Sequence, residues 1–588
     1  MSATTSPSNT PQPAVNGQQN GSSVQPAADT RQAPSRDRHA TRRPRPAANL
    51  SAGDRPWSAA EKIAFRIAFI FFIVISLPNN LAWYDELIHF NWLRLNYRDL
   101  YDIARFDGGI ALSRTFFGST LIGYATWLWT LVIAIAAGLV WTAIVKARHK
   151  ERKEYNTLYY WLRVIVRYRA GIGIIGFGFT KLFPVQMPYP SLGVLNTNFG
   201  DLTAQKVFWL SVGIVPWYQV FAGIVECLAG TLLFFRRTTT VGAILLFAAL
   251  GDIVYVNLAY DGGVHVYASY FVLLAGFLLA KDIPRIYRLL IQERVTIPVE
   301  HYPVLKRAWQ RWTRIGLKSA TFFLFIILLF WLQYVNFRYD PYKQPAVAGV
   351  PVLRGNYIVS EFRINNQTIP YNPLDTTRWQ DATFENWSSL TFSVNHPLPL
   401  ELGNGGGAPQ RDIERNFEIS GVAGGRRVFH YYADTVEKVL YLEDKYKTPD
   451  SSRQRGGRSA NAKRGKGSTV TGQQEGVVRE SDPDKAAPSG AGEGRHRKGG
   501  WIPAAAWAHI GNEVNHINPL AASARRDKEY AEAKPEKRNH MILHYNTVDG
   551  SHIILSGIDD RKDSIYIVLD RNPRPYALSE SSLQAGSY

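Results

Sequence analysis

Charged side chains inside apolar stretches are the residues of this 588-residue chain that could do chemistry. A charge inside a bilayer costs a few kcal/mol unless it is paired or hydrated, so such residues mark ion networks or polar cavities. Glu226 sits at the middle of one apolar stretch, and Asp252 lies about three residues beyond the middle of the next. Arg167, Arg169 and Lys181 lie in the stretch before both.

These intramembrane charges have two interpretations. In the first, Arg169, Glu226 and Asp252 form a buried ion network that fixes the register of the helices. In the second, they line a polar cavity that handles protons, a quinone headgroup or a small solute. Gln219 joins this candidate site because it shares a helical face with Glu226.

Small residues on the same two stretches predict close helix packing. A helix whose face carries glycine lets the backbone of a neighbour approach. The glycines concerned are Gly171, Gly173, Gly176 and Gly178 in one stretch, and Gly223 and Gly230 in the other.

A second polar cluster is predicted at the outer mouth of the membrane region, around a Gly262-Gly263 turn. Aspartate and histidine at this spacing could bind an ion or relay protons. Alternatively, these residues cap helices and contact interfacial water. The candidate residues are Gln186, Asn257, Tyr260, Asp261 and His265, with Tyr267 just beyond them.

Several other chemistries are excluded. None of the 13 histidines lies at the middle of an apolar stretch, so haem ligation by histidine pairs within the bilayer is not expected. The single cysteine, Cys227, leaves no thiol-redox centre and no cysteine-rich zinc site. No nucleotide-binding or HExxH motif is present, and no metal ligand set is predicted. A redox role would therefore use a diffusible or partner-held cofactor, such as a quinone.

The elements that must position these residues are membrane helices. Seven apolar stretches each approach the length needed to cross a hydrocarbon layer of about 30 Å, although the sixth is short. They cover approximately residues 61–78, 121–145, 161–184, 217–235, 239–259, 266–280 and 317–335. Between the sixth and seventh stretches, residues 283–297 are predicted to form an amphipathic surface helix.

Lysine and arginine collect in alternate connections, which predicts the orientation. Basic residues fill the N-terminal tail, residues 146–153, Arg236-Arg237 and residues 281–318, whereas 79–117, 185–215 and 259–265 are near neutral. The positive-inside rule then places the N-terminus in the cytoplasm and the C-terminal part outside. Much of the net charge of +19 would face anionic lipid, so no nucleic-acid partner is expected.

Beyond residue 336 the apolar period changes to two, typical of strands. Strand-like runs recur at 356–365, 382–386, 390–394, 416–421, 427–432, 439–442, 540–545, 552–558 and 564–569. Short strands without long helices between them predict an antiparallel barrel or sandwich. The Gly355-x-Tyr357 entry is similar to lipocalins, whose barrel encloses one apolar ligand or fills its own interior.

The middle of the chain resembles the DoxX-like family of integral membrane proteins. The resemblance covers about residues 160–282 and is carried by GFTKLFPVQMPYPS (178–191), the FAG-x-x-E block (221–226), the RRTTT loop (236–240) and the N-x-x-YD exit (257–261). It implies a four-helix membrane unit, and some members are subunits of quinol- or thiosulfate-linked oxidoreductases. Members that use thiol chemistry carry cysteine pairs, which this chain lacks. The resemblance also implies a bacterial cytoplasmic (inner) membrane.

The predicted architecture is an α-helical polytopic membrane bundle with an extracytoplasmic antiparallel β domain. Its parts are a disordered basic tail (1–57), a two-span region (58–156), the DoxX-like unit (157–282), an amphipathic segment with the last span (283–337), and the β domain (338–588) with a disordered insertion at 448–500. Three functions stay open: a component of a quinone-linked membrane oxidoreductase, a membrane-anchored binding or transport protein for a lipid or small molecule, and an assembly factor that docks a membrane or extracytoplasmic protein.

Overall fold

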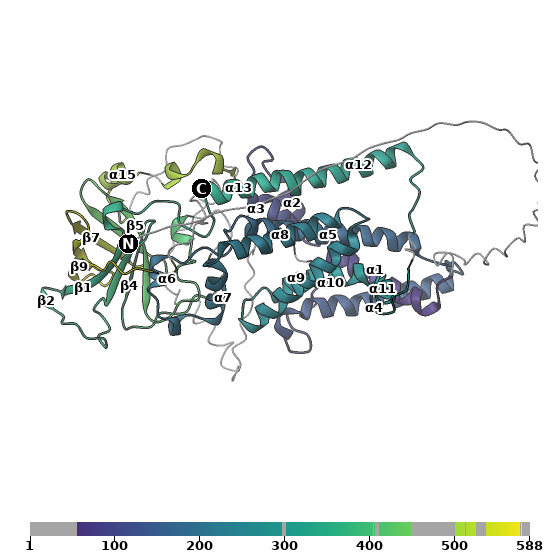
Figure 1. Ribbon diagram of the computed structural model, residues 1–588, viewed down its shortest axis with the longest axis horizontal. Coiled ribbons are helices and arrows are strands. Elements are labelled where there is room, and N and C mark those ends of the chain that lie inside the picture. The colour runs from purple at the N-terminus through teal and green to yellow at the C-terminus, as the bar shows by residue number, and fades with distance from the viewer. Residues whose placement is uncertain are drawn as a thin grey trace, which may run out of the picture. The chain divides into compact units, whose positions relative to one another are not determined.

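The computed structural model describes residues 56–106, 108–296, 301–403, 405, 411–447, 500–511, 513–524, 537–576 and 578. A helical bundle is followed along the chain by an antiparallel β domain (Figure 1). The described residues belong to one compact unit. The predicted tail (1–57) and insertion (448–500) lie outside the described residues except at their inner edges.

Helices occupy all seven predicted apolar stretches. They are α1 (Ala59–Ser76), α4 (Ala125–Ala147), α5 (Asn156–Leu182), α8 (Pro216–Leu233), α9 (Thr239–Ala259), α10 (His265–Ala280) and a continuous run of α12 (Ala308–Phe322), the π-helical η3 (Phe323–Leu328) and α13 (Leu329–Tyr339). In the described part of the chain, three helices are long and apolar enough to cross a membrane: α4, α9 and the run 308–339. Several apolar helices thus indicate a membrane protein.

Two bent helix pairs raise the number of candidate spans to five. Helix α7 (Ala204–Gly213) meets α8 at 90°, and α10 meets α11 (Ile283–Leu290) at 71°. Helix α11 forms where the amphipathic surface helix was predicted, but it ends at Leu290 instead of residue 297. None of its residues is buried.

The α5–α8 interface is built on the small residues that the sequence predicts. A Cβ atom at Gly178 would lie 2.6 Å from Cys227 Sγ, and one at Gly223 would lie 2.3 Å from the backbone nitrogen of Leu182. Gly171 meets the carbonyl of Gly230 in the same way, at 3.0 Å. Only glycine lets the two backbones come this close, so the predicted packing face is confirmed.

The connections between helices fall at two ends of the bundle. At one end, Thr240 donates to Asp282 and Trp57 donates to Asn156, so the basic connections lie together. At the other end, the backbone of Leu192 donates to Glu385 of the β domain. We call these the basic end and the β-domain end.

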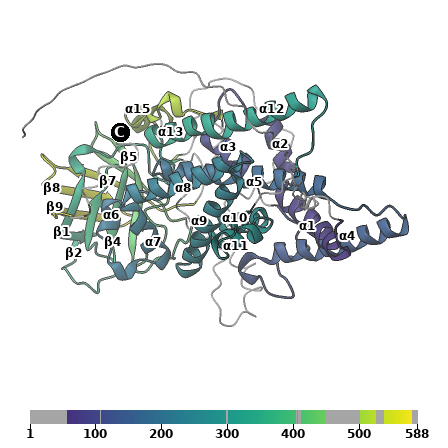
Figure 2. The same ribbon diagram turned by 45° about the vertical axis from the view of Figure 1, so that its right-hand side comes forward.

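Two short helices lie at the β-domain end, α3 (Tyr97–Ala104) and α6 (Leu192–Leu195), and α2 (Leu81–His89) precedes α3 along the chain. Helix α3 contacts both α5 and α13, as Figure 2 shows. The Tyr97 ring lies 5.7 Å from the Tyr342 ring in the link to the β domain. Gln205 of α7 donates to the carbonyl of Gly262 at 3.4 Å, so the α9–α10 connection lies at this end as well.

The β domain is a closed antiparallel barrel of eight strands. They are β1 (Gly355–Ile364), β3 (Asp381–Phe384), β4 (Ser389–Ser393), β5 (Arg426–Asp434), β6 (Val439–Asp444), β7 (His540–Asn546), β8 (His552–Ile558) and β9 (Ser564–Arg571). Each strand pairs with the next around the barrel, and β9 closes the ring on β1. The two-residue β2 (Gln367–Thr368) only extends β1 as a hairpin. Of the two predicted architectures, the barrel is confirmed.

Large apolar side chains fill the barrel interior. Alternate residues of the strands point inward, with one shift at a bulge in β1 between Val359 and Glu361. The side chains of Phe362, Phe384, Phe392 and Phe429 are each at most 1 % exposed. Helix α15 (Ala504–Ile510) covers part of the outside, with Trp507 against Tyr432. The barrel therefore uses its interior as its own core.

One predicted strand is wrong. Residues 416–421 form turns, because their apolar residues pack on the bundle and not in a sheet. The Phe417 ring stacks on Trp209 of α7 with centroids 6.3 Å apart. Phe417 and Ile419 are both buried, so this segment shows the same alternating pattern as a strand although it pairs in no named strand.

Candidate functional site in the helical bundle

Arg169 is the central residue of α5 and has no acidic partner in the described chain. Its side chain is buried, with 6 % exposed. Nη1 donates to the carbonyl of Ala104 at 2.6 Å, and Nη2 donates to the carbonyl of Phe106 at 3.1 Å. These carbonyls lie at and just after the end of α3, where a helix leaves its last acceptors unpaired. The end of α3 is thus held by a cation.

Aromatic rings surround the same guanidinium. The Arg169 Cζ atom lies 3.9 Å from the centroid of the Phe106 ring and 5.0 Å from that of Tyr270. The Arg105 Cζ atom lies 5.3 Å from the centroid of the Tyr267 ring. Cations over ring faces are attracted by the ring quadrupole, and more strongly in a dry site.

Two glycines of α5 make room for this cluster. A Cβ atom at Gly173 would lie 2.9 Å from Arg169 Nη1, and one at Gly176 would lie 3.0 Å from the ring of Tyr101. Gly171 and Gly178 face α8 instead. The glycine-rich sequence of α5 therefore serves two faces, one for helix packing and one for the Arg169 cluster.

Four buried polar atoms around this cluster make no hydrogen bond of good geometry within the described chain: Arg169 Nε, Tyr267 Oη, Ser76 Oγ and Trp83 Nε1. The Tyr267 hydroxyl nevertheless lies close to the Arg169 guanidinium, and Ser76 lies close to the Tyr270 hydroxyl. Ser76 follows Ile75, whose carbonyl accepts from the Tyr270 hydroxyl at 2.7 Å, and the Trp83 ring lies 5.8 Å from that of Phe106. Buried polar atoms are nearly always paired, so a group of unpaired ones needs an explanation.

The backbone beside Arg169 is irregular and held from several sides. Gly108 approaches α1 so closely that a Cβ atom there would lie 2.2 Å from the carbonyl oxygen of Ile75. The backbone nitrogen of Ile110 donates to Thr130 Oγ1 of α4 at 2.9 Å. In membrane proteins, non-helical backbone among apolar helices occurs where protein buries it or where it lines a cavity, frequently at binding sites.

Arg66 of α1 provides the contrast with Arg169. It is fully buried but lies 3.1 Å from a carboxylate oxygen of Glu151, and it donates to Thr142 and Tyr155 at 2.8 Å each. A structural arginine in this bundle is thus neutralised and hydrogen-bonded. Arg169 has hydrogen bonds but no neutralising carboxylate among the residues described.

The predicted network of Arg169, Glu226 and Asp252 does not form. Glu226 pairs instead with Lys181, whose Nζ lies 2.8 Å from both carboxylate oxygens. Asp252 is exposed on α9 and has no ion-pair partner among the residues that the structure covers. The rotation of each helix about its axis, which spacing along one helix cannot reveal, sends the three side chains to different neighbours.

The remaining predicted intramembrane residues have local partners. Gln219 exchanges two hydrogen bonds with the backbone of Met187, at 3.1 and 3.0 Å. Arg167 donates to Thr239 Oγ1 at 3.3 Å, at the start of α9. Gln219 therefore holds the chain after α5, and Arg167 lies at the basic end.

The predicted outer-mouth residues do not form one site. Asn257 donates to the carbonyl of Ile253 at 2.7 Å, and His265 Nε2 lies 2.8 Å from the carbonyl of Ile122. Gln186 accepts from Thr180 at 3.3 Å, and the Tyr260 ring stacks on that of Phe208. Asp261 is exposed in the turn, with a φ of 52°. The structure thus gives these residues contacts at helix ends and in loops, which agrees with the alternative that they cap helices and not with a single ion-binding site.

Buried ionisable groups also join the bundle to the barrel. Glu385 accepts from the backbone of Leu192 and Gly193 at 2.9 and 2.7 Å. Burial, and then the neighbouring Glu418, raise the pKa of Glu385 to about 7. Burial lowers the pKa of His430, on β5, to about 4.

These two shifts act in opposite directions on stability. The folded chain binds a proton at Glu385 more readily than the unfolded chain does, so this group makes stability fall as the pH rises from about 4.5 to 7. The folded chain resists protonation of His430, so this group makes stability fall as the pH drops from about 6.5 to 4. Between pH 4.5 and 6.5 the two effects largely cancel.

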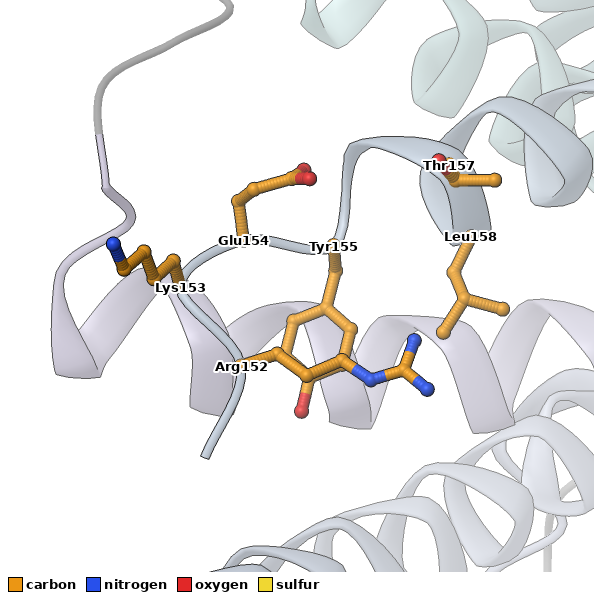
Figure 3. Close-up of a pocket in the computed structure, with 6 residues that line it drawn as sticks. All are labelled: Arg152, Lys153, Glu154, Tyr155, Thr157 and Leu158. Atoms are coloured by element: carbon orange, nitrogen blue, oxygen red, sulfur yellow. The ribbon is translucent and has the colours of Figure 1, made fainter. Parts of the chain in front are cut away.

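A pocket of about 300 Å³ lies at the basic end, far along α5 from Arg169. Figure 3 shows its lining residues along the α4–α5 connection and the first turn of α5: Arg152, Lys153, Glu154, Tyr155, Thr157 and Leu158. None of the predicted site residues lines it. Among the residues that the structure describes, no group of three His, Cys, Asp or Glu side chains is placed to hold a metal ion.

Comparison with known proteins adds little. No family model and no solved structure matches the chain. A curated protein, the uncharacterized protein YwoB of Bacillus subtilis (strain 168), is 29 % identical over 123 residues, which are 19 % of this chain and 77 % of YwoB.

Proposed function

We propose that this chain is a DoxX-like membrane protein whose helical bundle binds the headgroup of a membrane quinone beside Arg169. The observation that carries the proposal is a buried guanidinium that has no carboxylate partner among the described residues and is placed between aromatic rings beside the Tyr267 hydroxyl. Sequence resemblance to a family with quinol-linked members supports the same assignment.

The residues present fit a quinone headgroup chemically. A quinone is a flat ring with two carbonyl oxygens, which need hydrogen-bond donors. Within the described chain, Arg169 Nε–H and the adjacent Tyr267 hydroxyl make no hydrogen bond of good geometry, and Phe106 and Tyr270 offer ring faces. A positive charge in a dry site also favours electron density on a bound oxygen. A bound quinone would supply electron-acceptor chemistry, whereas the protein residues bind and orient it.

The orientation forms part of the proposal. The connections at the β-domain end are those that the sequence shows to be poor in lysine and arginine, and the opposite connections are basic. By the positive-inside rule, the β domain lies outside the cytoplasm of a bacterial cell, on the cytoplasmic (inner) membrane.

The β domain is proposed as a docking module and not as a lipid carrier. Its interior is filled by its own side chains, which leaves the carrier alternative without support from the structure. A protein that exchanges electrons with the quinone would dock from the same side, because α3 contacts both the Arg169 site and the link to the barrel.

The test is to measure the quinone that copurifies with the full chain from a quinone-containing membrane, by organic extraction and mass spectrometry. We expect close to one quinone per chain, strong loss in Arg169→Gln and partial loss in Tyr267→Phe. Arg167→Gln is the matched control, because it removes the same charge from α5 at a residue with different contacts. Equal quinone content in all four proteins would refute the assignment.

A further inference from the structure

A second group of cations lies at the basic end of the bundle, away from the Arg169 site. Arg167 Nη1 donates to Thr239, but its Nε atom is buried without an acceptor in the described chain. Lys318 of α12 lies within electrostatic range of both Arg167 and Arg314. Its Nζ atom lies 4.0 Å from the centroid of the Phe235 ring.

These three cations have no carboxylate partner among the residues that the structure covers. The neighbouring Arg163 shows what pairing looks like here, since its guanidinium lies 3.8 Å from Asp282. Like charges at the surface of a membrane protein repel one another, and the repulsion is relieved when an anion binds between them.

The start of α9 adds to the attraction for an anion. This helix is 21 residues long and begins at Thr239, next to Arg167. Its N-cap residue, Thr238, makes no side-chain capping bond. The nearby carboxylate of Asp282 accepts from the Thr240 hydroxyl at 2.8 Å and is shared with Arg163 and Arg285. Helix N-termini carry a partial positive charge and favour anions.

Apolar residues beside the cations indicate that the anion is attached to lipid. Phe235 is 39 % exposed and Leu317 is 67 % exposed. Arg314 and Lys318 are one helical turn apart on α12, so they share a face. We propose that Arg167, Lys318 and Arg314 bind the phosphate of an anionic phospholipid, with its acyl chains against Phe235 and Leu317.

The experiment uses the full chain in phosphatidylcholine nanodiscs and measures the retention of added phosphatidylglycerol by native mass spectrometry. A basic residue that lies against the lipid phosphate is expected to contribute about fivefold to the retention of the lipid, whereas a basic residue remote from the phosphate contributes little. We therefore expect about fivefold weaker retention in Arg167→Gln and in Lys318→Gln, and about 25-fold weaker retention in the double variant.

The control is Arg288→Gln, which removes one exposed charge from α11 at the same end of the bundle. It should bind phosphatidylglycerol like the unaltered chain. Equal weakening in Arg288→Gln, or unchanged binding in the double variant, would overturn the site. A parallel titration with inorganic phosphate separates the sources: the proposal expects no displacement of phosphatidylglycerol at millimolar phosphate, and displacement would overturn the lipid assignment.

Discussion

The Lys181–Glu226 pair offers a strong test of how the bundle is held together. Lys181 Nζ lies 2.8 Å from Glu226, whose side chain is 2 % exposed, in the interface between α5 and α8. Removing one partner leaves the other charge buried and unpaired. Such a change costs about 3–5 kcal/mol, whereas replacing both partners by apolar residues of similar volume is close to neutral.

The expected values follow for three variants. Lys181→Met and Glu226→Leu should each lower the free energy of unfolding by about 3–5 kcal/mol, and the double variant should lower it by less than about 1 kcal/mol. The assay is denaturant-driven unfolding of the full chain in detergent, followed by tryptophan fluorescence. Losses below about 1 kcal/mol in both single variants, or losses that simply add in the double variant, would refute the pairing.

Three further predictions concern other parts of the chain. In Glu385→Gln, the free energy of unfolding should rise between pH 4.5 and 7 by about 3 kcal/mol more than in the unaltered chain, because the variant cannot lose a proton there. In His430→Gln, the free energy of unfolding should rise less than in the unaltered chain between pH 4 and 6.5. Denaturation at several pH values measures both effects. Gly178→Ala should cost about 1–3 kcal/mol by overpacking against Cys227, whereas Gly251→Ala, with no atom within 4 Å, should be neutral or stabilising in thermal unfolding. Tyr267→Phe should change the thermal midpoint of the quinone-free protein little, because within the described chain its hydroxyl makes no hydrogen bond of good geometry; a clear loss would show that its contact with Arg169 is a full hydrogen bond.

Much of the fold follows from patterns in the sequence. Apolar stretches predict the helices because lipid or protein must cover each of them, and the glycine face of α8 predicts close packing against another helix, which the structure shows to be α5. The change to period two predicts the barrel strands. The pattern is misleading at residues 416–421. Phe417 is buried there because it stacks on Trp209 of α7, and not because it lies in a strand.

Less of the candidate site than of the fold can be predicted from the sequence. Arg169 stands out because it is charged, but its acceptors are the backbone carbonyls of Ala104 and Phe106, and every residue has such a group. The sequence places Glu226 and Lys181 among the candidates without pairing them, because the pair depends on how α5 and α8 rotate against each other. No spacing in the chain points to Arg105, Tyr101 or Tyr270, which the fold brings to Arg169 and Tyr267.

The most direct test of the central claim is an experimental density map of the full chain, purified from a quinone-containing membrane into nanodiscs. The account predicts non-protein density within hydrogen-bond distance of Arg169 Nε and the Tyr267 hydroxyl, lying against the ring of Phe106. A map in which protein side chains or single water molecules satisfy both atoms, with no space for a ring, would contradict it.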